Sequence, residues 1–138
     1  MSRENKALVQ RWFDEVWTKG SVPSIDALMA PSCKVHGLGE NMHGPEGFKA
    51  FHAAYRDAFP DVMINVDHMV AEGDIVAARW SGTGTHRGNG LGFSGTNRPV
   101  RFSGMTFARI QDGKLVEGWN VFDQLGMLQQ LGIVNLPA

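Results

Sequence analysis

The chain has a single cysteine, no long apolar run and almost no net charge. Because Cys33 has no second cysteine to pair with, an internal disulfide is excluded and a reducing cytoplasm is the expected location. No apolar run reaches the about 18 residues that a membrane-spanning helix needs, and the polar N-terminus is unlike a signal peptide. A net charge of −1 argues against nucleic acid or an anionic membrane as the main partner.

Several signatures of metal, phosphate and nucleophilic chemistry are also missing. No two of the five histidines have the i, i+4 spacing of helical metal ligands, so we expect no metal site. The glycines that cluster between Gly82 and Gly95 lack the pattern of a phosphate-binding loop and precede no helix. No serine occupies a nucleophile elbow, which argues against a serine hydrolase.

The composition and the apolar patterns of the chain fit one α+β domain spanning residues 1–138. Hydrophobic residues make up 43% of the chain and charged residues 20%, an ordinary balance for a folded domain. An apolar stripe with helical spacing predicts a helix over residues 3–19, and a shorter helix follows Pro23 and ends at Pro31. A third helix opens at Gly44-Pro45 and stops at Pro60. Its apolar stripe comprises Phe48, Phe51, His52, Tyr55 and Phe59.

From Asp61 onward the chain shows the alternating pattern of β-strands. One strand carries alternating apolar residues from Val62 to Val70, and a longer strand returns from Asp74 to His86. A glycine-rich loop over Arg87–Arg98 is expected to be mobile. Three helices, four mostly antiparallel strands and a helical tail predict helices packed on one face of a curved sheet.

The last two strands form a hairpin around Asp112-Gly113, because a two-residue turn needs positive φ. An uninterrupted register from this turn places Thr106 opposite Trp119 and Phe102 opposite Asp123. These four residues then share one largely apolar face, which resembles the inside of the molecule. The pattern predicts Asp123 at the far end of that face, among apolar and aromatic neighbours.

Motifs along the chain resemble those of a known family. Trp80-Ser-Gly-Thr-Gly-Thr-His86, the glycine-rich loop, Asp112-Gly113-Lys114-Leu115, Glu117-Gly-Trp119 and the segment from Asp123 to Gly132 follow the family order. The chain resembles SnoaL-like polyketide cyclases of the nuclear transport factor two-like superfamily. The resemblance implies a cystatin-like, cone-shaped fold in which a bent antiparallel sheet wraps around helices and encloses a pocket. It also implies a dimer and a reaction without metal or organic cofactor.

In the family, the aspartate after the last-strand tryptophan is the acid/base of an intramolecular aldol ring closure, and by motif position this is Asp123. Members often have histidine directly before the tryptophan, where this chain has Gly118. Position 118 lies on the face opposite Trp119, so we expect the change to alter packing or dimer contacts more than catalysis.

Other residues are expected to complete the pocket. His86 ends a long strand beside the glycine-rich loop and is the predicted second catalytic group. The predicted substrate-binding residues are Trp12, His36, His52, Phe102, Thr106 and Trp119. A lone histidine on an apolar helix stripe, such as His52, is also typical of a hydrogen-bonded core residue.

The leading functional hypothesis is a cyclase or isomerase that moves a proton at a carbon acid of a hydrophobic, polyketide-like substrate. A carboxylate in an apolar pocket suits this task, because desolvation raises its pKa toward neutral pH. Asp123 also precedes a helix and suits an N-cap, which favours a non-catalytic protein that binds a hydrophobic metabolite. An epoxide hydrolase is a third hypothesis, and it would need two acids and an arginine around one water. Glu117 lies roughly 20 Å along the strand from Asp123, too far to act with it on one bond.

Overall fold

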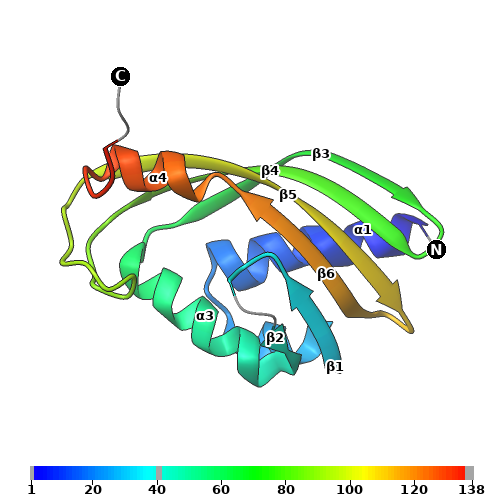
Figure 1. Cartoon of the computed structure of the whole chain (residues 1–138). Coiled ribbons are helices and arrows are strands. Elements are labelled where there is room, and N and C mark those ends of the chain that lie inside the picture. The colour runs from blue at the N-terminus through cyan, green and yellow to red at the C-terminus, as the bar shows by residue number, and fades with distance from the viewer. Residues whose placement is uncertain (1, 40–41, 136–138) are drawn as a thin grey trace.

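The computed structural model describes residues 2–39 and 42–135 and has the predicted α+β architecture. A six-stranded sheet has the order β2-β1-β6-β5-β4-β3. The sheet is strongly curved, and Figure 1 shows α1 and α3 on the same side of it, under the strands. The space between these helices and the sheet holds the larger part of the core.

The helical segments follow the predicted stripes closely. The helix predicted over residues 3–19 is present as α1 (Ser2–Arg11) and η1 (Trp12–Thr18), the second part being wound as a wider π-helix. The next helix, α2 (Val22–Leu28), starts at the cap residue Ser21 and ends before Pro31, which lies in a strand instead. The third helix, α3 (Gly44–Ala58), matches its predicted span.

The sheet contains two more strands than the alternating pattern predicts. Short β1 (Met29–His36) and β2 (Met42–His43) come before α3, and β1 runs parallel to the last strand. The predicted antiparallel meander follows as β3 (Met63–Glu72), β4 (Ile75–Thr85), β5 (Pro99–Gln111) and β6 (Lys114–Phe122). Helix α4 (Gln124–Gln130) closes one end of the sheet (Figure 1).

The Asp112-Gly113 hairpin is confirmed, but the predicted register beyond it is wrong. Both turn residues have positive φ, 52° and 72°. Ile110 pairs with Leu115, while the next pair is Arg109 with Glu117, so one extra residue forms a β-bulge in β6. Because side chains alternate with a period of two, this single insertion reverses the face of every later residue of β6.

After the bulge, Asn120 lies opposite Thr106, and Trp119 lies opposite Phe107. Asn120 therefore faces the helices, whereas Trp119 faces outward. The predicted pairing of Phe102 with Asp123 is also wrong, since the Asp123 N–H donates to the carbonyl oxygen of Ser103.

A second β-bulge interrupts β3 and likewise reverses the faces of the residues that follow it. The pairing with β4 shifts between Val66 and His68. Val66 is partly buried against the core, but Val70 is 67% exposed on the outer face. The alternation that begins at Val62 therefore does not continue on one face.

Candidate functional site

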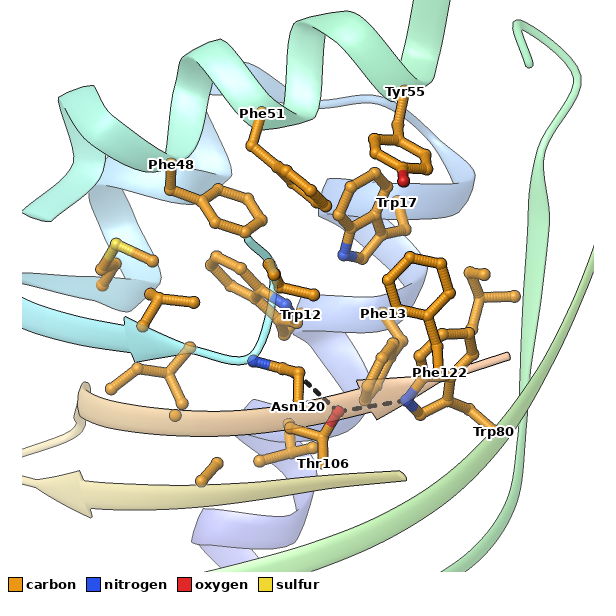
Figure 2. Close-up of a pocket in the computed structure, with 18 of the residues that line it drawn as sticks. Trp12, Phe13, Trp17, Phe48, Phe51, Tyr55, Trp80, Thr106, Asn120 and Phe122 are labelled. Carbon is orange, nitrogen blue, oxygen red and sulfur yellow. Dashed lines mark hydrogen bonds between the residues drawn. The ribbon is translucent and has the colours of Figure 1, made fainter. Parts of the chain in front are cut away.

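A cavity lies between the helices and the inner face of the sheet. The space that the centre of a water molecule can reach is about 100 Å³, several times the ~10–15 Å³ that one water requires. Aromatic side chains make most of its wall: Trp12, Phe13, Trp17, Phe48, Phe51, Tyr55, Phe59, Trp80, Phe102 and Phe122. In Figure 2, Phe48 and Phe51 point from α3 toward Trp12 and Trp17 of the N-terminal helix. The cavity wall is thus complementary to flat, apolar groups.

One chain of hydrogen bonds crosses this apolar wall on the side of the sheet. The Trp80 indole N–H donates to Thr106 Oγ1 at 3.1 Å, and the Thr106 hydroxyl donates to Asn120 Oδ1 at 2.8 Å. Asn120 Nδ2 donates to the carbonyl oxygen of His36 at 3.2 Å (the first two bonds are drawn in Figure 2). These groups come from four adjacent strands, and the register of β4, β5, β6 and β1 holds them together.

A carboxylate and an imidazole form a pair on the outer face of the sheet, where the strands β6 and β1 bound the cavity. Glu117 contributes to the cavity wall from β6, but it shares the outer face of the strand with Trp119, and its Oε2 lies 2.7 Å from His36 Nε2. Both side chains are about a quarter exposed, 26% for Glu117 and 29% for His36. Burial raises the pKa of the Cys33 thiol to about 11, and the nearby negative charge of Glu117 adds to this shift. The Glu117 charge is therefore felt inside the cavity wall.

Asp123 does not lie on the inner face, which corrects its predicted placement. Its side chain is exposed, caps α4 and accepts the Gly126 N–H at 2.9 Å through Oδ1. The bulge in β6 explains the difference, because it turns the residues of the inner face outward and vice versa. A catalytic role for Asp123 stays a prediction, in surroundings more polar than the apolar pocket expected for it.

His86 and His52 were both predicted to line the pocket, and both lie outside the cavity lining. His86 is 0% exposed and packs against Phe59 in a smaller core cluster at one end of the sheet, where its Nδ1 accepts the Thr96 N–H at 3.2 Å. His52 is 3% exposed, and its Nε2 lies 2.6 Å from the Val16 carbonyl oxygen. The latter geometry is that of a hydrogen-bonded core histidine.

Of the predicted binding residues, the structure brings Trp12, Phe102 and Thr106 to the cavity. His36 and Trp119 stack on each other and line an open groove on the other side of the sheet. Sequence reasoning missed the polar cavity residues Glu117 and Asn120. It also missed that Gly118 faces the cavity.

His52 makes the stability of the fold depend on pH. Burial lowers its pKa, the positive charge of Arg56 acts in the same direction, and the bond to Val16 opposes them. A histidine whose pKa is lowered by folding binds fewer protons in the folded state, so stability is lost as pH falls below its unfolded pKa. We expect thermal unfolding between pH 7.5 and 5 to show a smaller loss of stability for His52→Gln than for the wild type. The exposed His68→Gln is the control, and equal pH slopes for all three proteins would contradict this assignment.

Residues 2–39 and 42–135 contain no cluster of three His, Cys, Asp or Glu side chains that could hold a metal ion. No helix among them is long and apolar enough to span a membrane.

Comparisons with known proteins agree on one family. The sequence profile of SnoaL-like polyketide cyclases matches residues 7–131. A proposed SnoaL-like polyketide cyclase of Jannaschia sp. CCS1 is 25% identical, with a TM-score of 0.88 over 97% of this chain and 95% of that one. AclR, a proposed hydroxylase of Streptomyces galilaeus, is 27% identical, with a TM-score of 0.87 over 99% and 91%.

IdmH, a proposed polyketide cyclase of Streptomyces antibioticus, is 28% identical, with a TM-score of 0.81 over 93% of this chain and 98% of that one. No curated protein sequence matches this chain. The family profile spans nearly the whole domain, and the solved structures share its sheet, helices and length. The chain therefore belongs to the SnoaL-like polyketide cyclase family.

Proposed function

We propose that this protein is a small-molecule enzyme of the cyclase type, which moves a proton at a carbon acid to close a ring in, or isomerise, a polyketide-like substrate. The observation that carries the proposal is the aromatic cavity, whose wall includes one acidic residue, Glu117. Relatives with the same fold include a proposed cyclase and a proposed hydroxylase, so the reaction must be argued from this site.

We assign Glu117 as the base, acting where the cavity wall meets the outer face of β6. It is the only carboxylate on the cavity wall among the residues that the structure describes. Its partner His36 holds one oxygen in place and can pass a proton to the exterior, because both side chains are partly exposed. The family motif favours Asp123 instead, which would require the reacting carbon to lie at the C-terminal end of β6, outside this cavity.

One observation favours the second candidate, a binding protein without catalysis. The cavity wall is almost entirely apolar, and Asp123 is occupied as a helix cap. An epoxide hydrolase gains no such support, since a single carboxylate lines the described cavity wall.

Deuterium exchange at the α-carbon of a ketone distinguishes the enzyme from the binding protein. 2-Tetralone is a flat, apolar bicyclic ketone whose α-protons exchange slowly with water and are followed by NMR in D₂O. We expect the protein to accelerate this exchange at pH 7. Binding of 2-tetralone without acceleration would overturn the enzyme proposal and support the binding protein.

The outer face of the sheet favours a homodimer. Val70, Ala77, Phe107 and Trp119 form a row across four strands, and Met105 and Val121 form a pair beside it. Val70, Met105, Phe107 and Val121 are between 56% and 75% exposed, an unusually apolar surface for a monomer. Charged residues of both signs, Arg79 and Asp67 among them, lie around the row. Because such a surface can be complementary to itself, a second copy of the chain is a suitable partner.

A charged residue introduced into this row is expected to dissociate the dimer. Phe107→Glu should halve the molar mass measured by sedimentation, because two buried carboxylates would face each other across the symmetric interface. Val22→Glu, a change of the same kind at an exposed position of α2, should leave the mass unchanged. A wild-type protein that sediments as a monomer would contradict the dimer.

A further inference from the structure

We infer that Asn120 is a specificity-determining residue that holds a carbonyl oxygen of the ligand through its side-chain N–H. This inference deepens the proposed function, since it takes the cavity as the substrate site. Asn120 lines the cavity from β6, on the inner face that the bulge created. What it offers to a ligand depends on which way its amide is turned, and its hydrogen bonds fix that direction from both ends.

The first constraint comes from Trp80. An indole N–H can only donate, so Thr106 Oγ1 must accept at this contact. The hydroxyl proton of Thr106 is then free to donate to Asn120 Oδ1, over 2.8 Å. This chain of bonds turns the carbonyl end of the amide toward β5.

The second constraint comes from the backbone of β1. The carbonyl oxygen of His36 can only accept, so the group 3.2 Å away must be the NH₂ of Asn120. A flipped amide would place two oxygens against each other at this contact and would lose this bond, so the His36 carbonyl selects the orientation that the Thr106 hydroxyl also satisfies. The amide orientation is therefore set by the strands on either side of β6.

The amide nitrogen has two protons, and His36 uses one of them. Among the hydrogen bonds of the described residues, none involves the second proton. Gly118, also on the cavity wall, leaves room beside this nitrogen, because a side chain there would begin 3.8 Å from Nδ2. The cavity thus has space for a ligand atom next to an unused donor.

Two further N–H groups of the cavity wall are also hydrogen-bond donors. The indole N–H groups of Trp12 and Trp17 also line the cavity, and they too can only donate. Figure 2 shows both tryptophans on the helical side, facing Asn120 and Thr106 on the sheet. A complementary ligand is apolar and flat and carries acceptor oxygens, such as ketone or enolate groups, rather than hydroxyl donors.

The test compares two probes of nearly the same shape, 2-tetralone and the hydrocarbon tetralin. Their affinities are measured for the wild type and for Asn120→Leu, which keeps the size of the side chain but removes the donor. We expect the ratio of ketone to hydrocarbon affinity to fall about tenfold in the variant, the effect of one hydrogen bond. The carbonyl stretching band of bound ketone should lie at lower frequency in the wild type than in the variant.

Phe122→Leu is the matched control on the same strand and face, and it should weaken both probes equally. If Asn120→Leu fails to fold, Gly118→Leu makes the comparison, because its side chain would fill the space beside Nδ2 and leave the bonds of the amide in place. Unchanged affinity ratios, an unshifted band in the wild type, or no binding of either probe would overturn the inference. Because no turnover is measured, a ketone preference without deuterium exchange would refute only the enzyme proposal.

Discussion

Glu117→Gln is expected to slow the exchange of 2-tetralone α-protons by about 10²–10⁴-fold, the usual contribution of a general base. The amide keeps the size of the side chain and its contact with His36 Nε2, but it cannot take a proton. Affinity for the ketone should change little, because the carboxylate is turned toward His36 and away from the aromatic wall of the cavity. NMR in D₂O measures the rate, and the ratio of ketone to hydrocarbon affinity serves as an independent check that the cavity is intact.

Asp123→Asn is the matched control, since it makes the same chemical change a short distance along the chain. An asparagine oxygen still accepts the Gly126 N–H, so α4 stays capped and the exchange rate should be unchanged. The reverse result, loss of exchange in Asp123→Asn and full activity in Glu117→Gln, would contradict our assignment and support the base that the family motif predicts.

Phe59→Ala is expected to destabilise the fold by about 3–5 kcal/mol, typical of truncating a fully buried phenylalanine. Phe59 is 1% exposed and belongs to the smaller core cluster, yet it also lines the cavity, so it joins the two parts of the core. Its ring packs against Phe102, His86 and Tyr55. Thermal unfolding should show a Tm lower by about 10–20 °C.

Phe93→Ala makes the same change at a residue that is 42% exposed in the glycine-rich loop, and its Tm should stay near that of the wild type. Similar Tm values for Phe59→Ala and Phe93→Ala would contradict the role of Phe59 as the link between the two clusters.

Most of the fold is readable from the sequence, because each element carries a local signal. The stripe over residues 3–19, the proline at the start of α3 and the Asp112-Gly113 turn each have a direct physical cause. β1 has no such signal, since three polar or proline positions interrupt its apolar residues. Its place in the sheet depends on a parallel partner far away in the sequence.

The sequence does not predict in the same way which face of β6 lines the cavity. Both faces of the strand carry apolar residues, Trp119 and Val121 on one and Phe122 on the other. The hydrophobic pattern therefore cannot reveal one inserted residue near Val116, and the regular register favours the wrong face. The motif identified the family correctly, while the position of each side chain depended on the bulge.

The parallel pairing of β1 with β6 has a consequence for synthesis. The helices α1 to α3 and the strand β1 leave the ribosome well before residues 114–122, so the aromatic residues of the cavity wall have no complete sheet to cover them. Long-range pairing of this kind is slow, and the exposed surface is prone to association in the meantime. A nascent chain arrested before Lys114 is thus expected to recruit chaperones, and one arrested after α4 has emerged is not.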